Sequence, residues 1–555
     1  MAVNRERDGF HHPASEADLV ALVKAAHREG RNLRVRGAAH STARAIHGDG
    51  DAVNVMLDRY RGWQVRDRAQ KLVEAQAGIH LGADPGDASG SATEERSLLG
   101  QLAEEHRWTL ELTGGITHQT ISGFTATGSS GGSLKYSANE NLHAIRVIDG
   151  RGDVREFTRD DDDFYAMAPS MGLLGVVSTI TLACTDLFAI EGDEAVAAAG
   201  SCGIDLFGAG DARRPSLERF LRDTDFSRIE WWPQRGLDRV VVWRARRVQP
   251  NAAFSPMPYR RFAGDAVASQ QLIAALYAIL GNLDDLGKAR ALLEDNFDAL
   301  KRVLRTMAGG PVLAAVLAGV TEGGFDAATR VLEPLAPVIR RGIPDFFPRL
   351  ADMFVPLDSD KHGAERGRPQ RFRDWSWRGL PMDNEVNHQL LPTSFTETWI
   401  PLPLTGKVMR ELKRYFGEPG EAESYRRTGT FVWEVYAAMP TPFWLNPGYT
   451  SGTDEWRHGA FRVNPYWFAD SSADPGEALF GGLWDLLRDK GIPFRLHWGK
   501  HHPSSASGDR RWVDFFAAQY PRWEDFLRLR TERDPGNIFL TDYWRDRFGL
   551  WDART

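Results

Sequence analysis

Cysteine is almost absent from this chain, and so is any long apolar segment. Only Cys184 and Cys202 occur among 555 residues, which excludes a disulfide-stapled secreted scaffold and any CxxC metal motif. The longest apolar run, at 311–320, is about half as long as a bilayer span requires. The first residues lack the apolar core of a signal peptide. We therefore expect a soluble, cytoplasmic protein without a membrane span.

A surplus of positive charge is also missing. The chain holds 68 basic and 75 acidic residues, a formal net charge of −7, and no dense Lys/Arg tract interleaved with aromatic residues. Nucleic acid is therefore not an expected partner. Apolar residues make up 42% and charged residues 26%, as in a globular protein, and 555 residues predict two or three domains.

Three regions differ in their residue patterns. Residues 1–190 alternate helical and strand patterns, which predicts an α+β domain. Residues 191–490 carry strand patterns typical of a wide antiparallel sheet, interrupted at about 266–341 by an Ala- and Leu-rich helical insertion. Within this region, residues 358–379 are polar and indicate a loop. Residues 491–555 return to short elements with many aromatic residues.

Two segments combine small residues with groups that bind phosphate. In RVRGAAHS (34–41), small residues precede His40 and would let backbone N–H groups approach a diphosphate; a plain turn is the alternative. The segment 114–133 holds many glycines and hydroxyls with apolar anchors, which suits a long cofactor better than a linker. No GxGxxG follows a strand, so a nicotinamide cofactor is not indicated.

Two further segments are candidates for contact with a planar ring. In SMGLLGVVSTITLAC (170–184) glycines lead into an apolar strand, which is either a plain buried strand or backbone facing a ring. In FRLHWGKHHP (494–503), Lys500 is either a solvated lysine or a fixed positive charge beside a redox centre. Its histidines have no companion cluster at zinc spacing, so no metal site is predicted.

In this order and spacing, the four segments resemble the PCMH-type FAD-binding fold of the vanillyl-alcohol oxidase superfamily. The resemblance covers residues 14–190, 228–245 and 430–545. The segments IEWWPQRGLDRVVVWR, FRLHWGKHH and RDPGNIFLTDYW are similar to those of its aldonolactone and alditol oxidase branch.

The resemblance implies an α+β fold with three parts. These are a two-part FAD-binding domain (1–190), a substrate domain (191–490) built on a large antiparallel sheet with covering helices, and a C-terminal segment (491–555) that returns to the flavin site. It also implies FAD as cofactor, bonded covalently through His40 to the flavin 8α carbon. The cofactor-binding residues it implies are Arg36, Gly37, Ala38, Ala39, His40, Ser41, Gly114, Gly115, Thr120, Ser122, Gly123, Ala126, Thr127, Gly128, Gly175, Val176 and Val177.

On the substrate side the sequence departs from the family. Alditol oxidases carry a Glu-x-Arg pair on one strand and a histidine on the next; here the first strand has Glu434 and Tyr436, and the next has Arg462 and Asn464. The segment 380–402 is similar to flavin-linked cholesterol oxidases. The predicted catalytic residues are Lys500, Glu434 and Asn464, and the predicted substrate-binding residues are Glu397, Tyr436, Arg462 and His497.

Together these features predict FAD-dependent oxidation of a CH–OH group by hydride transfer to flavin N5. The substrate would be a sugar, polyol, aldonolactone or bulkier alcohol, and oxygen or another acceptor would reoxidise the flavin. Lys500 would stabilise negative charge, and Glu434 would act as a base if burial raises its pKa. A sterol-type alcohol oxidase is one alternative, and a non-catalytic binding protein on a decayed flavin fold is another.

Overall fold

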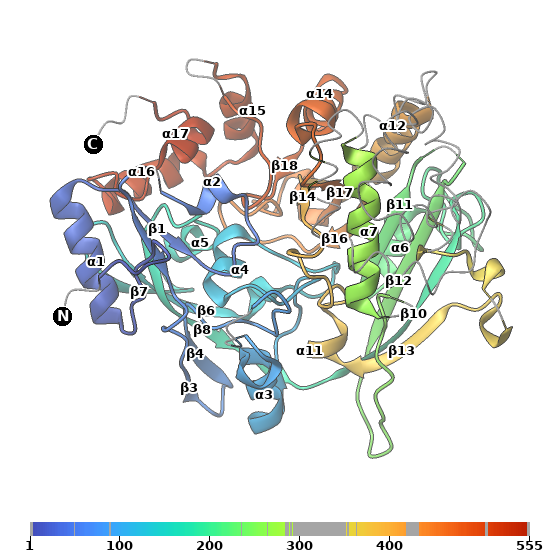
Figure 1. Ribbon diagram of the computed structural model, residues 1–555, viewed down its shortest axis with the longest axis horizontal. Coiled ribbons are helices and arrows are strands. Elements are labelled where there is room, and N and C mark those ends of the chain that lie inside the picture. The colour runs from blue at the N-terminus through green and yellow to red at the C-terminus, as the bar shows by residue number, and fades with distance from the viewer. Residues whose placement is uncertain are drawn as a thin grey trace.

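The computed structural model divides the chain into a smaller N-terminal α+β half and a larger sheet with covering helices (Figure 1). It describes residues 4–551 apart from 49, 88–89, 91, 235, 263–264, 283–287, 289–290, 292–350, 352–353, 362, 418–431 and 506–508. Most of the predicted helical insertion therefore lies outside the described residues, and only its first helix, α7 (Ala266–Gly281), is seen.

The first unit of the N-terminal half packs one helix on a two-stranded parallel sheet. Helix α1 (Glu16–Glu29) begins at a capping box formed by Ser15 and Asp18 and ends at Gly30, and its apolar stripe is buried. Strand β1 (Leu33–Arg36) pairs with β2 (Val53–Met56), and the short helix α2 (Ala43–Ile46) lies between them in the chain. Strand β1 therefore ends directly before the loop that carries His40.

The second unit is a five-stranded antiparallel sheet in the order β3-β4-β8-β6-β7. The strands are β3 (Trp63–Asp67), β4 (Leu72–Gln76), β6 (Leu142–Ile148), β7 (Val154–Thr158) and β8 (Val176–Ala183), and the helices are α3 (Leu98–His106), α4 (Ile121–Thr127) and α5 (Phe164–Met167). A separate pair joins β5 (Trp108–Thr109) to β9 (Thr185–Asp186).

A nine-stranded sheet forms the larger half, with the path β13-β10-β12-β11-β16-β17-β15-β18 and β14 paired to β17. Among the described residues, neighbouring strands of this sheet pair antiparallel. Helices α6 (Leu217–Asp223), α7, α11 (Ser376–Gly379) and α12 (Thr405–Gly417) accompany it. The strands are β10 (Ala189–Ala198), β11 (Phe226–Trp232), β12 (Arg239–Val248), β13 (Gln370–Trp375), β14 (Thr393–Phe395), β15 (Thr398–Pro401), β16 (Trp433–Ala438), β17 (Ala460–Phe468) and β18 (Arg495–Leu496).

The predicted α+β class with a large antiparallel sheet is confirmed, but one local prediction was wrong. Residues 358–379 were expected to form a loop, whereas Gln370–Trp375 form edge strand β13, paired with β10. The segment is polar because its outward residues Arg371 and Arg373 are exposed, while Phe372 and Asp374 between them are buried. Such alternation is the pattern of a strand with one solvated face.

The last elements of the chain return to the N-terminal half. Figure 1 shows α16 (Trp523–Arg533) and α17 (Asp542–Phe548) beside α1 and α2, reached through α14 (Gly481–Asp489) and α15 (Arg511–Gln519). The Leu33 N–H donates to the Ile538 carbonyl at 2.7 Å, which fixes β1 against the C-terminal segment. Trp498 stacks on Phe548 at a ring-centroid distance of 5.4 Å. The segment that carries Lys500 is therefore anchored close to the loop that carries His40.

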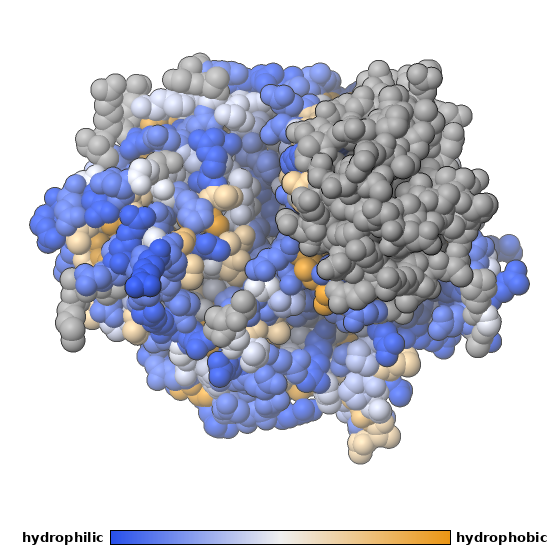
Figure 2. Space-filling view, in the orientation of Figure 1, coloured by the Kyte–Doolittle hydropathy of each residue, from blue (hydrophilic) through white to orange (hydrophobic). Residues whose placement is uncertain are grey.

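The face shown in Figure 2 is mostly hydrophilic over the described residues, with small scattered apolar patches. None of the described helices is long and apolar enough to cross a membrane. The expected cytoplasmic location stays a prediction.

Candidate active site

All four segments singled out in the sequence contribute to the wall of one narrow cavity of about 120 Å³. A wider cavity of about 710 Å³ adjoins it, and the two share the loop 37–41 together with Thr120, Gly499 and Lys500. Of the predicted cofactor-binding residues, those lining the narrow cavity are Gly37, Ala38, Ala39, His40, Ser41, Thr120, Ser122, Gly123, Ala126, Thr127, Gly175, Val176 and Val177, and Arg36 lines the wider one.

Three predicted cofactor residues lie elsewhere. Gly114 and Gly115 border a separate small pocket beside Tyr436, and the Gly115 carbonyl accepts the N–H of Asp383. Gly128 ends helix α4 with a φ of 73°, a backbone conformation that glycine adopts without strain. In the described structure these three glycines shape the segment and do not line the two cavities.

The small residues of the first loop are required by close packing. A Cβ placed on Gly37 would lie well inside contact distance of the Thr120 hydroxyl, which caps α4 by accepting the N–H of Gly123. Ala39 has a φ of 61°, so the loop turns sharply just before His40. The loop therefore runs directly against the start of α4 and presents the imidazole at its tip.

Helix α4 divides its side chains between core and cavity. Ile121 and Phe124 are buried in the main core, whereas Ser122, Gly123, Ala126 and Thr127 line the narrow cavity. This division follows the helical period, since positions four apart share a face. The sequence analysis identified these residues as a glycine-rich loop, and the structure adds that a short helix positions them.

The third segment also depends on one glycine. Gly175 has a φ of 140°, and a Cβ there would overlap the carbonyl oxygen of Ile148 on β6. The backbone at the start of β8 therefore lies close to β6 while its other side, with Val176 and Val177, lines the narrow cavity. The valine side chains and the uncovered backbone at this wall fit a planar ring.

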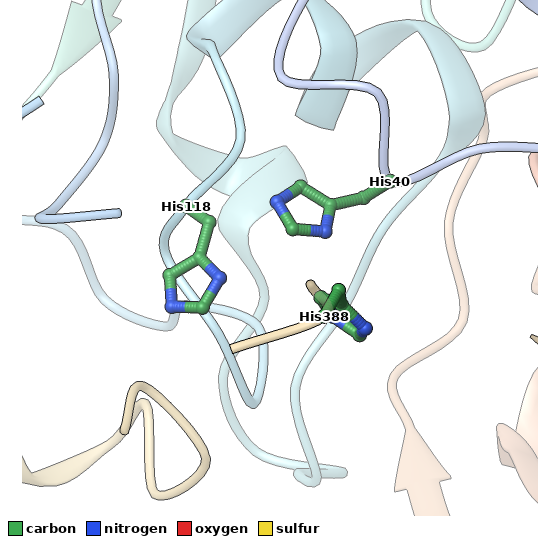
Figure 3. A group of neighbouring side chains, drawn as sticks. All are labelled: His40, His118 and His388. Atoms are coloured by element: carbon green, nitrogen blue, oxygen red, sulfur yellow. The ribbon is translucent and has the colours of Figure 1, made fainter. Parts of the chain in front are cut away.

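His40 lies at the junction of the two cavities within a cluster of imidazoles (Figure 3). Its ring centroid is 5.2 Å from that of His118 and 4.9 Å from that of His388. Burial, together with these neighbours and Lys500, lowers the pKa of His40 far below its usual value, so the ring is neutral. Its Nε2 is buried without a hydrogen-bond partner. A neutral imidazole at a cofactor cavity fits the predicted covalent flavin link.

The same three histidines are the one cluster with metal-ligand spacing among the described residues. Their ligand atoms lie within 4.8 Å of one another. Tetrahedral zinc with nitrogen ligands at 2.0–2.1 Å requires ligand atoms about 3.4 Å apart, so the rings would have to close around an ion. His118 and His388 were not identified from the sequence, because they come from segments without a recognisable metal or catalytic spacing.

Lys500 lies between the cavities and next to the anchor loop. Its Nζ donates to the His40 carbonyl at 3.0 Å and lies 4.1 Å from the ring centroid of Phe395. Burial lowers the pKa of Lys500 to about 8, while the charges of Glu397 and Glu434 oppose that shift. The ammonium group therefore loses its proton only slightly above neutral pH.

His497 is held in one neutral tautomer beside the glycine-rich segment. Its Nδ1 accepts the Gly499 N–H at 3.1 Å, so the proton is on Nε2, which faces the Ser129 hydroxyl at 3.4 Å. Burial lowers the pKa of His497 to about 4. Ser129, which the sequence analysis did not select, lines the narrow cavity together with His497.

Arg462 lies opposite the position where the family motif has an arginine. Tyr436, at the position of that arginine, pairs directly with Arg462 on the neighbouring strand, and the guanidinium lies over its ring at 4.5 Å. Arg462 bonds to Glu397 at 3.0 Å and donates to the carbonyls of Ser130 and Gly131, both at 3.1 Å. The guanidinium therefore joins the substrate sheet to the glycine-rich segment.

Glu434 and Asn464 form a second cross-strand pair, two residues away on the same strands. The Glu434 carboxylate accepts from Asn464 at 3.3 Å and from Tyr466 at 2.8 Å. Burial raises the pKa of Glu434 to about 7. Glu434, Asn464, Glu397, Tyr436 and Arg462 do not line either of the two described cavities, so their direct contact with substrate stays a prediction.

Comparison with known proteins agrees with this site. Residues 8–83 match the family described as FAD binding domain, and residues 484–547 match the family described as D-arabinono-1,4-lactone oxidase. A cholesterol oxidase from Brevibacterium sterolicum has the same fold, with a TM-score of 0.66 and 13% identity over 97% of this chain and 94% of that chain. The matched segments and the shared fold thus indicate an FAD-binding fold. FAD is therefore its cofactor.

Two curated relatives match part of this FAD-binding chain. The L-gulono-1,4-lactone dehydrogenase of Mycobacterium tuberculosis is 30% identical over 182 residues, 32% of this chain and 38% of that protein. The D-arabinono-1,4-lactone oxidase of Saccharomyces cerevisiae is 24% identical over 248 residues, 43% of this chain and 41% of that protein. The matches thus span about two fifths of these relatives.

Packing of Gly37 against Thr120 yields a test of the cofactor loop. We expect Gly37→Ala to reduce the FAD content of the purified protein at least about fivefold, because the added methyl group displaces the loop. The double variant Gly37→Ala/Thr120→Ala removes the overlapping hydroxyl and should recover part of the loss, whereas Thr120→Ala alone only weakens the α4 cap. Flavin absorbance per protein measures all three, and full FAD content in Gly37→Ala would contradict the assigned loop contact.

Proposed function

We propose that the protein oxidises the CH–OH group of a polar, hydroxyl-rich alcohol of the aldonolactone or polyol class. The observation that carries this proposal is the character of the wider cavity at Lys500. Its described lining is dominated by polar and charged side chains, among them Asp8, His12, Asp58, Asp84, Asp87, Asn387, Gln389, Thr393, Ser394 and His501. Such a lining can hydrogen-bond several substrate hydroxyls, whereas a sterol needs apolar walls.

The relatives named as aldonolactone oxidases and dehydrogenases support this substrate class, and the shared fold with cholesterol oxidase supports the sterol-type alternative only at the level of architecture. An intact cofactor cavity argues against a non-catalytic protein on a decayed flavin fold. We therefore propose an FAD-dependent alcohol oxidase or dehydrogenase, with oxygen or another electron acceptor as its second substrate.

Within this proposal, Lys500 stabilises negative charge on the substrate, and residues of the nine-stranded sheet hold the surrounding groups in position. Bound FAD supplies the two-electron acceptor for the carbinol hydrogen. The Lys500 ammonium faces both cavities and stabilises negative charge on the substrate oxygen. Arg462 fixes the carbonyls of Ser130 and Gly131 and so holds the segment that borders the cavity. Glu434, with its pKa near neutrality, is the candidate proton acceptor next to Asn464.

A substrate panel tests the proposed class. Under anaerobic conditions, we expect aldonolactones or sugar alcohols to bleach the flavin absorbance in a stopped-flow instrument, and sterols in detergent to leave it unchanged. Bleaching by sterols alone would favour the sterol-type alternative. If no alcohol reduces a fully loaded flavin, the non-catalytic alternative stands instead.

The charge of Lys500 predicts a pH dependence. Because Lys500 loses its proton at a pKa of about 8, the rate of flavin reduction should fall as pH rises through that value. Lys500→Arg keeps its charge at higher pH, so the alkaline decline should disappear, while Lys500→Met should reduce the rate about 10²-fold or more at neutral pH. A wild-type decline that persists unchanged in Lys500→Arg would assign it to another group.

Covalent attachment through His40 is a separate part of the proposal. We expect the yellow colour to stay with the protein after acid precipitation, and the denatured band to fluoresce on a gel. His40→Ala should still bind FAD through the other walls of the cavity but release it on denaturation, because no second nucleophile is assigned. Flavin that remains attached in His40→Ala would place the link at another residue.

A further inference from the structure

Figure 3 shows the imidazole of His40 next to His118 and His388, which come from two distant parts of the chain. His118 comes from the segment before α4, and His388 from the segment between α11 and β14. The fourth group is Asp84, whose Oδ2 lies 4.0 Å from the His40 Nε2, with both side chains only 13% exposed. The contact therefore forms only in the folded protein, at the border of both cavities.

Asp84 is fixed in place by its own loop. Its Oδ1 accepts the Gly86 N–H at 2.8 Å, and its backbone N–H donates to the Ala92 carbonyl at 2.9 Å. These bonds leave Oδ2 turned towards His40. Burial lowers the pKa of both His80 and His118, and the Asp84 charge opposes the shift in each case. The imidazoles of His40, His80 and His118 therefore all lie near the Asp84 carboxylate.

The neighbouring rings make Asp84 the natural acceptor for His40. His118 donates its Nε2–H to the Asn384 carbonyl at 3.0 Å, so in the neutral ring Nδ1 carries no proton and donates nothing to His40. The His40 Nε2 is buried and forms no hydrogen bond, and the Asp84 Oδ2 at 4.0 Å lies just beyond hydrogen-bond distance. The negative charge of Asp84 favours a proton on that nitrogen. In the neutral ring the lone pair is then on Nδ1. Carboxylates fix histidine tautomers in this manner in catalytic triads.

We propose that Asp84 is the positioning residue for covalent flavin attachment, holding His40 as the Nε2–H tautomer so that Nδ1 bonds to the flavin 8α carbon. The inference rests on the proposed His40 link. The new bond joins Nδ1 to the 8α carbon, and that carbon loses one hydrogen as a proton. The Nε2 proton is shared with Asp84 as positive charge forms on the ring and then leaves to solvent. The electron pair of the broken C–H bond stays on the flavin, and oxygen takes it up, as in the reoxidation proposed for turnover.

The test uses the full chain, produced under riboflavin limitation and then mixed with FAD. Native absorbance reports total bound flavin, and fluorescence of the denatured band reports attached flavin over time. We expect Asp84→Asn and Asp84→Ser to bind FAD but to attach it at least about tenfold more slowly, and Asp84→Glu to recover part of the rate. Asp205→Asn is the matched control, because Asp205 also accepts an N–H of its own loop, that of Gly208 at 2.9 Å, but lines neither cavity; its attachment rate should equal that of the wild type.

Each outcome is decisive. Attachment at the wild-type rate in Asp84→Asn or Asp84→Ser overturns the inference, as does an equal loss in Asp205→Asn. Loss of non-covalent FAD binding in both Asp84 variants also overturns it, because Asp84 would then act in binding and not in attachment. A wild-type protein that binds FAD and releases all of it on denaturation refutes the His40 link instead, and one that binds none refutes the proposed function.

Discussion

The guanidinium of Arg462 connects the two halves of the active site. Its planar group is enclosed by the rings of Trp399 and Tyr436, bonded to Glu397, and directed at two carbonyls of the glycine-rich segment. A buried guanidinium without these partners would be very costly, so sheet and segment hold their relative position. This contact joins residues more than 300 positions apart in the chain. The relative position of the cofactor cavity and the predicted substrate strands depends on it.

Much of the cofactor site could be predicted from sequence, because its chemistry is local. A loop that approaches a diphosphate needs small residues, and Gly37, Ala126 and Gly175 stand where the structure brings backbone to the cavity. The resemblance supplied the order in which the four segments meet. Strand β13 was missed because an edge strand with a solvated face has the polar composition of a loop.

The environment of His40 and the role of Arg462 could not be predicted, because both arise from tertiary pairing. His118 and His388 become neighbours of His40 only when the segment 380–392 packs on the glycine-rich segment. One bond in this packing is donated by the Thr117 N–H to the side-chain oxygen of Asn384 at 2.7 Å. Arg462 lies opposite Tyr436, at the position of the family arginine, only through the β16–β17 register. Neither relation leaves a spacing that a single sequence reveals.

The position of the HWGK segment has a consequence for biosynthesis. Trp498, Gly499, Lys500, Phe539 and Trp544 line the narrow cavity together with residues 33–35 and 37–41. A nascent chain that has been translated only as far as the nine-stranded sheet's β17 possesses the His40 loop but lacks its counterpart. The lining of the narrow cavity is therefore complete only once the C-terminal segment has been made.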